Sequence, residues 1–182
     1  MLVEYSVDRN DCVRSVGAAW FEFACGNKAQ NLTSEAVVGR PLWDFIANDQ
    51  VRHIYQILLD RVRSLRETLV VPFRCDGPDV RRFMELQLTP VTNEGVRLEA
   101  RLVREERREF IRLLGADPHR SDEFVTICSW CKKVQHDGRW LDLEAAVARQ
   151  GLFVANELPQ LTHGICEQCT QQFKSEFVGQ QA

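Results

Sequence analysis

The chain of 182 residues has no long apolar run and no excess of positive charge. No stretch approaches the roughly 18 consecutive apolar residues that read as a membrane span, and Glu4 stands where a secretory signal would carry cations. The 23 Lys and Arg residues are outnumbered by 26 Asp and Glu residues, so no overall basic field attracts a nucleic acid. We expect a cytoplasmic protein without a membrane partner, and we do not expect nucleic acid as its main partner.

The motifs of several common enzyme classes are also missing. The sequence contains no nucleophile elbow of the type Gly-x-Ser-x-Gly, no phosphate-binding loop of the type Gly-x-x-x-x-Gly-Lys-Ser/Thr and no His-Glu-x-x-His pair. At roughly 150 residues per domain, the length allows one ordinary domain and a small appendage, with no room for a kinase or cyclase output domain. We therefore expect no enzymatic activity and an output through protein contacts.

The first hundred residues carry the pattern of an α+β fold. Apolar positions at the helical period predict the longest helix from Asn48 or Asp49 to about Ser64. The last two predicted strands alternate apolar and charged residues, so one face of their sheet must be covered. The predicted strands span residues 2–7, 13–16, 68–74, 81–89 and 95–103. We predict a five-stranded antiparallel sheet with helices on one face.

This order of elements resembles a PAS domain over residues 1–104. Val-Gly-Arg at 38–40 leads into the helical crossing and Arg-Cys-Asp at 74–76 approaches a hairpin, whereas Gly17 stands where many PAS domains have Asn. The resemblance implies a bacterial sensory or adaptor domain that forms a homodimer and acts on a protein partner. It also implies a pocket between sheet and helices that holds haem, flavin, a small metabolite or nothing, and it implies no catalysis.

One residue of the predicted long helix suggests haem. His53 stands about where oxygen-sensing PAS domains carry the histidine that binds haem, but its helical phase is opposite the apolar face and favours an exposed side chain. A haem sensor is therefore the weaker alternative. The isolated Cys25 and Cys75 lack the Asn- and Gln-rich surroundings of flavin-binding light sensors, so we expect ordinary buried thiols.

Residues 105–121 are predicted to be a helical connector and linker. The stretch from Arg104 to Leu114 is charged and amphipathic, and Pro118 lies in the segment that follows it. Its small apolar patch leaves two interpretations open, a signalling or dimer helix and a solvated connector. The arginines at 61, 63, 66, 81 and 82 are expected on solvated faces.

Four of the seven cysteines form two pairs near the C-terminal end. Two residues separate Cys128 from Cys131, and two separate Cys166 from Cys169. Such spacing lets both sulfurs of a pair face one ion, and two pairs complete a closed tetrahedral zinc site. We predict structural Zn²⁺ in a module spanning residues 122–182, where metal binding replaces the large core that about sixty residues cannot form.

The surroundings of the pairs fit this prediction. A helix-like run from Cys166 to Phe177 places the second pair at a positive helix end, which favours thiolates. A short helix is expected over residues 144–150. The expected small core consists of Trp130, Trp140, Leu141, Leu143, Val147 and Phe153. The order knuckle, hairpin, helix, loop and second knuckle resembles treble-clef or zinc-ribbon modules, and the cysteine motifs resemble a module attached to bacterial PAS proteins.

Two alternatives stay open for the cysteine module. Each pair could be a dithiol that closes into a disulfide, which would make the protein a thiol-based redox sensor. Lys132, Lys133 and Arg139 could contact phosphate, which would make it a zinc-dependent nucleic-acid-binding regulator. His163 is expected beside the site, because four sulfurs already complete the coordination shell.

Overall fold

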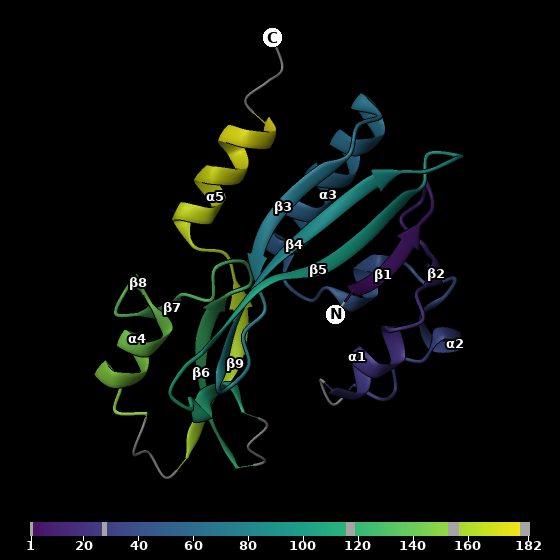
Figure 1. Cartoon of the computed structure of the whole chain (residues 1–182). Coiled ribbons are helices and arrows are strands. Elements are labelled where there is room, and N and C mark those ends of the chain that lie inside the picture. The colour runs from purple at the N-terminus through teal and green to yellow at the C-terminus, as the bar shows by residue number, and fades with distance from the viewer. Residues whose placement is uncertain (1, 27–28, 116–118, 153–156, 179–182) are drawn as a thin grey trace. The chain divides into compact units, whose positions relative to one another are not determined.

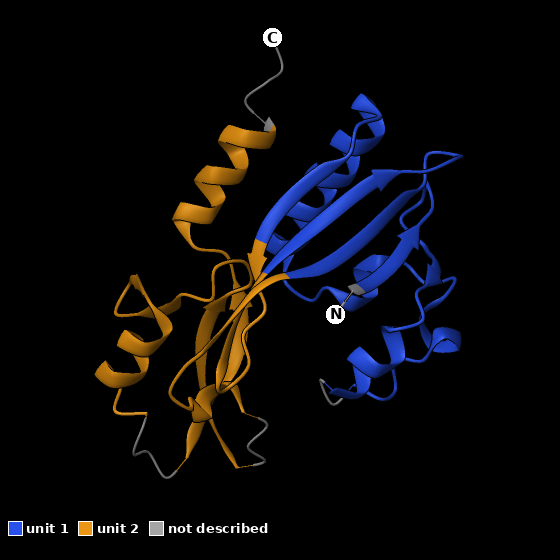
Figure 2. Cartoon of the chain, in the orientation of Figure 1, with its two compact units in different colours: residues 1–72, 84–102 blue, residues 73–83, 103–182 orange. Residues whose placement is uncertain are grey.

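The computed structural model describes residues 2–26, 29–115, 119–152 and 157–178. The chain forms two compact units (Figure 2): unit 1 contains residues 1–72 and 84–102, and unit 2 contains residues 73–83 and 103–182. The boundaries fall inside three strands, β3 (Leu69–Arg74), β4 (Val80–Pro90) and β5 (Val96–Arg107). Each of these strands therefore belongs in part to both units.

Unit 1 is built on a five-stranded sheet (Figure 1). It adds β1 (Leu2–Val7) and β2 (Val13–Val16) to the three strands above, in the order β2-β1-β5-β4-β3. Strand β1 pairs antiparallel with both of its neighbours, so that Tyr5 lies opposite Val16 on one side and Leu98 on the other. The predicted α+β fold class with a five-stranded antiparallel sheet is confirmed.

The helices of unit 1 connect β2 to β3. They are α1 (Trp20–Gly26), α2 (Ser34–Val37), the short 3-10 helix η1 (Leu42–Phe45) and α3 (Asp49–Leu65). Helix α3 begins where its sequence predicts, because the Asn48 side chain accepts a hydrogen bond from the Val51 N–H at 3.1 Å. It ends at Arg66, whose left-handed backbone (φ 56°) closes the last turn.

The core of unit 1 follows the predicted alternation. Leu88, Val96 and Leu98 have no exposed surface, and neither has Leu58 of α3. Burying one such side chain contributes about 1.5–3 kcal/mol. The opposite face of the sheet carries charge, because Arg101 donates to Glu85 at its exposed surface. Unit 1 is thus a sheet with one apolar and one charged face.

Unit 2 contains a second sheet of four strands. These are β6 (Arg120–Cys128), β7 (Val134–His136), β8 (Arg139–Leu141) and β9 (Leu158–Gly164), in the order β8-β7-β6-β9. Strands β6 and β9 are parallel, and the crossover between them contains the β7–β8 hairpin and α4 (Leu143–Arg149). The chain ends in α5 (Glu167–Phe173) and a π-helical turn, η3 (Lys174–Val178).

Two sequence predictions about unit 2 are wrong. Residues 158–164 form strand β9 rather than a loop, because parallel pairing with β6 satisfies their backbone although Pro159 interrupts the strand pattern. The described part of 105–121 contains no connector helix: β5 continues to Arg107, and only the 3-10 turn η2 (Arg112–Leu114) precedes β6. The reason is burial, since Ile111 and Leu113 lie in the core of unit 2.

The two units also divide the chain differently from the predicted domains 1–104 and 122–182. The hairpin end at 73–83 and the end of β5 both lie in unit 2. The predicted domain bounds therefore stay a prediction. None of the described helices is both long and apolar enough to cross a membrane.

Candidate metal centre

Two short turns carry the paired cysteines. Cys128 is the last residue of β6, and the turn after it is closed by hydrogen bonds from the Lys132 N–H to the Cys128 carbonyl (3.1 Å) and from the Cys128 N–H to the Lys133 carbonyl (2.7 Å). Lys132 takes the left-handed conformation (φ 64°) that this turn requires. Cys166 caps the N-terminus of α5 and Cys169 lies in its first turn.

The parallel pairing of β6 with β9 brings the two turns together. Cys128 lies opposite Gly164, and the Ser129 N–H donates to the Gly164 carbonyl at 2.9 Å. Strand β9 therefore delivers Cys166, two residues further on, to the side of the first pair. Strand β9, which the sequence pattern does not predict, aligns the two halves of the site.

The four sulfurs converge on one point. The Sγ atoms of Cys128, Cys131, Cys166 and Cys169 all lie within 4.8 Å of one another, and those of Cys131 and Cys166 are 3.6 Å apart. With a Zn–S bond of about 2.3 Å, a regular tetrahedron has edges of about 3.8 Å. A disulfide would require about 2.05 Å, and all seven cysteines are free. The spacing fits four ligands around one metal ion.

Hydrogen bonds within the cluster shift the pKa values of its thiols in opposite directions. Hydrogen bonds from the Cys131 and Cys169 thiols lower the pKa of Cys128, and the N–H groups of Cys131 and Cys166 act in the same direction. Because they donate to Cys128, the pKa of Cys131 rises to about 12 and that of Cys169 is also raised. A metal ion bound by all four sulfurs must therefore displace protons, so its affinity depends on pH.

Backbone groups and lysines support the negative charge of the sulfurs. The Cys166 N–H points to the Cys128 sulfur and the Cys169 N–H to the Cys166 sulfur, both at 3.4 Å. The ammonium group of Lys132 donates to the Ser129 carbonyl (2.8 Å) and that of Lys133 to the Gln168 side chain (3.0 Å). Both lysines directly follow the first cysteine pair in the chain, and their ammonium groups bind the turn and α5.

The site is largely closed to solvent. Cys128, Cys166 and Cys169 are buried, and Cys131 is partly exposed. The ring of Trp130, between the first two cysteines, meets Phe173 of α5 edge-on with centroids 4.7 Å apart. Four sulfurs, three of them buried, suit a structural ion better than a catalytic one, because a full set of sulfur ligands leaves no position for water.

The other residues predicted to bind a cofactor, lie beside the metal or form the small core differ in how exposed they are. His163 lies on β9 with its side chain exposed, and it is outside the four-cysteine cluster. His53 is exposed on α3, and its role with haem stays a prediction. Cys25 and Cys75 are partly exposed rather than buried. Of the predicted small core, Trp130, Leu143 and Val147 are buried, Trp140 and Leu141 are half-buried, and Phe153 lies outside the described residues.

Unit 2 also contains a buried ionic network that no local sequence pattern predicts. The Asp76 side chain is fully buried and is paired with Arg74 and with Arg108, whose side chain is 5% exposed. Arg108 reaches Glu144 of α4 (3.3 Å) and the Gly77 carbonyl (2.7 Å). Burial alone would raise the pKa of Glu144, but a hydrogen bond from Arg81 and the charges of Arg81 and Arg108 lower it. The hairpin end at 73–83 is thereby tied to α4.

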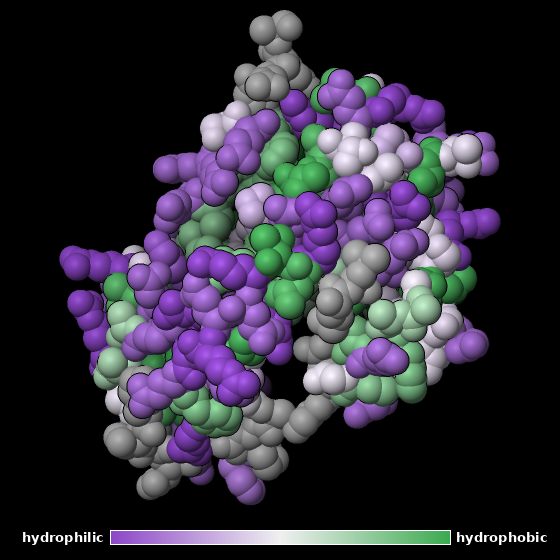
Figure 3. Space-filling model, in the orientation of Figure 1, coloured by the Kyte–Doolittle hydropathy of each residue, from purple (hydrophilic) through white to green (hydrophobic). Residues whose placement is uncertain are grey.

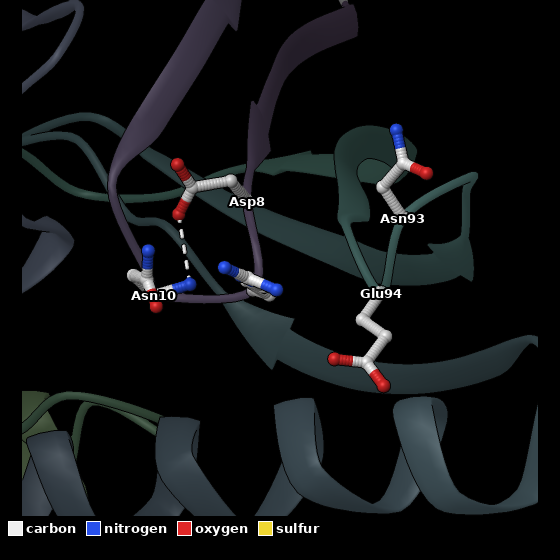
Figure 4. A pocket seen from close by; sticks show the side chains of 5 residues that line it. Asp8, Asn10, Asn93 and Glu94 are labelled. Carbon is white, nitrogen blue, oxygen red and sulfur yellow. Dashed lines mark hydrogen bonds between the residues drawn. The ribbon is translucent and has the colours of Figure 1, made fainter.

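Unit 1 has a separate, polar hollow. A pocket of about 450 Å³ lies where the β1–β2 turn meets the β4–β5 turn (Figure 4), lined by Asp8, Arg9, Asn10, Asn93 and Glu94. Asp8 accepts hydrogen bonds from the N–H groups of Asn10 and Cys12, so its carboxylate shapes the turn. On the face shown in Figure 3, apolar patches are small and lie among hydrophilic residues. The predicted ligand pocket between sheet and helices stays a prediction.

Comparisons with known proteins give likenesses at the level of solved structures. No protein-family model matches the chain, and the comparison with curated proteins gives no significant match. A domain of an HTR-like protein from Haloarcula marismortui is 12% identical with a TM-score of 0.43, covering 57% of this chain and 98% of that one. The PAS domain of nitrogen regulation protein NR(II) from Vibrio parahaemolyticus is 14% identical with a TM-score of 0.37, covering 56% and 89%. At these values, the fold assignment rests on the strand order described above.

Proposed function

We propose that this chain is a bacterial, cytoplasmic PAS-like sensor or adaptor whose C-terminal part binds one structural zinc ion. Cys128, Cys131, Cys166 and Cys169 are its ligands. The convergence of their four Sγ atoms within 4.8 Å is the observation that carries the proposal. When bound, the ion supplies cross-linking of β6 to α5 and no reaction chemistry, because four sulfurs leave no position for water. The chain acts as a homodimer through contacts with a protein partner.

The residues around the site have definite roles in this proposal. The turn at 128–133 orients the first pair, and the helix start at Cys166 orients the second. The N–H groups of Cys166 and Cys169 stabilise the thiolates, and the aromatic contact of Trp130 with Phe173 excludes water. Unit 1 supplies the sensory part, for which the strand order with helices between β2 and β3 is the support.

The competing proposals have less support. A redox sensor needs one dithiol, whereas here both pairs converge on one point. A haem sensor would use His53, whose side chain is exposed on α3. A nucleic-acid-binding regulator would use Lys132, Lys133 and Arg139. The ammonium groups of the two lysines are engaged by Ser129 and Gln168, which leaves only Arg139, exposed on β8, for a phosphate.

Native mass spectrometry with elemental analysis tests the proposal. We expect about one zinc ion per chain and a dimer mass, and we expect Cys131→Ser to lose most of the zinc. Cys12→Ser is the matched control, because Cys12 lies in unit 1 outside the cluster. Less than half an equivalent of zinc, together with four thiols that react under native conditions, would rule out the metal centre. A Soret absorption band lost in His53→Ala would favour the haem sensor instead.

A further inference from the structure

Trp130 holds an unusual position within the first cysteine pair. It is one of the two spacer residues between Cys128 and Cys131, yet its side chain is only 8% exposed. The peptide groups of the spacer are bound on two sides. The Ser129 N–H donates to Gly164 at the end of β9, and the Trp130 carbonyl accepts from the Arg74 N–H at the end of β3 (2.8 Å). The turn that carries the first pair is thus bound to both strands.

The ring of Trp130 makes the same connection through packing. It contacts Phe173, four residues after Cys169 on α5, with centroids 4.7 Å apart and an interplanar angle of 89°. On the β3 side it meets Phe73, with centroids 6.1 Å apart. Aromatic pairs of this geometry contribute about 0.5–1.5 kcal/mol beyond their burial. One side chain therefore links the elements of both cysteine pairs to the hairpin end at 73–83.

The hairpin end has a second attachment, distinct from the cysteine turns. Asp76, Arg108 and Glu144 hold it to α4 through the buried ionic network. The Ile111 N–H also donates to the Pro78 carbonyl at 2.8 Å. Because β3 and β4 continue into the sheet of unit 1, this doubly held end is where those strands enter unit 2.

We propose that Trp130 is a positioning residue that couples metal occupancy of the four-cysteine site to the end of the β3–β4 hairpin. This inference rests on the proposed metal centre. Metal binding fixes the turn at 128–133, and the turn fixes Phe73 and the backbone of Arg74 through Trp130. Coupling of binding free energies is reciprocal, so a change that loosens the hairpin end must also weaken the hold on the metal. The hairpin end at 73–83 is thereby connected to the metal site although none of its residues is a ligand.

The test measures zinc release from the full-length, zinc-loaded protein to a chelating dye. We expect Phe73→Ala and Trp130→Ala to weaken zinc affinity about fivefold or more, the lower end of typical coupling, and we expect this loss to appear as faster release. Trp130→Phe should restore most of the wild-type rate, because it keeps an aromatic ring and the same carbonyl. Hydrogen exchange of the loaded Phe73→Ala protein should show faster exchange at the Arg74 amide.

Two matched controls separate coupling from general loss of stability. Val147→Ala removes buried volume from the core of unit 2 at a residue of α4 outside the turn at 128–133, and Val70→Ala changes an exposed residue of β3. Both should release zinc at the wild-type rate. Equal acceleration by Phe73→Ala and Val147→Ala, or none with Phe73→Ala, would overturn the coupling while leaving the metal centre intact. Failure of the wild-type chain to hold zinc would overturn the metal centre and the coupling together. If Trp130→Ala does not fold, Phe73→Ala still decides.

Discussion

Unit 1 and unit 2 stabilise sheets of similar strand number by different means. Unit 1 covers five strands with a 17-residue helix, and its core is apolar. Unit 2 has strands of three to nine residues outside the shared hairpin, and its helices α4 and α5 have seven residues each. It adds a buried ionic network and four converging sulfurs. Where secondary structure is too short to bury enough apolar surface, directed polar bonds and the proposed metal ion compensate for the smaller core.

Removal of the metal should have the largest effect, and this effect should separate unit 2 from unit 1. Chelation removes a binding free energy of about 10–16 kcal/mol, and Cys128→Ser removes part of it, so we expect the cysteine turns and α5 to unfold. Unit 1 does not depend on the sulfurs, and amides of α3 should keep their protection. Hydrogen exchange followed by mass spectrometry measures both units in one experiment. Equal loss of protection in both units would show that unit 1 needs the metal too.

Removal of one buried charge should have the next largest effect. Arg108→Met leaves the buried carboxylate of Asp76 with one partner fewer and the Gly77 carbonyl without its donor, at a cost of about 3–5 kcal/mol. Denaturant unfolding of the zinc-loaded protein measures this loss. Arg104→Met is the matched control: its partner Glu106 is at the surface, so the change should cost within about 1 kcal/mol. Similar costs for both would argue against the network.

A cavity in the core of unit 1 should lower the stability of the protein without changing its zinc content. Leu58 has no exposed surface in α3, so Leu58→Ala should cost about 2–5 kcal/mol. Leu65→Ala, in the same helix but 48% exposed, should cost less than about 1 kcal/mol. Zinc content should be unchanged in both variants, as measured by elemental analysis. Loss of zinc in Leu58→Ala would mean that the core of unit 1 supports the metal site.

The last expected effect is a pH dependence of the zinc affinity of unit 2. The raised pKa values of Cys131, about 12, and of Cys169 mean that metal binding at pH 7 releases at least the protons of these two thiols. Lowering the pH restores these protons, so the apparent zinc affinity should fall by roughly a hundredfold per pH unit. Calorimetry in buffers of different ionisation enthalpy counts the protons. Release of fewer than two would contradict the proton distribution described above.

Local patterns predicted most of unit 1 and the members of the candidate site. The Asn48 cap, the apolar period of α3 and the alternation in β4 and β5 act over a few residues, so the sequence displays them. The spacing of Cys128 and Cys131 is likewise local. How the two pairs meet depends on β9, whose partner lies almost forty residues earlier in the chain, and no local pattern encodes that pairing.

The partners of the charged side chains are also far apart in the sequence, so local patterns do not predict them. Arg63 and Arg81 were expected on solvated faces, but Arg63 binds Asp11 at 2.6 Å and Arg81 binds Glu144. Their partners lie 52 and 63 positions away. The prediction of a connector helix at 105–121 is wrong for the same reason, because Arg108 belongs to a buried network whose other members are distant in sequence. Charge that looks solvated along the chain can be enclosed once the chain has folded.

The sharing of three strands between the units has a practical consequence for fragments. A piece beginning at residue 122 would carry all four cysteines but lack Phe73, Asp76 and Arg108, and would thus leave Trp130 and Glu144 facing water. When fused to another protein, this fragment should be less stably folded than one that also includes the hairpin end at 73–83.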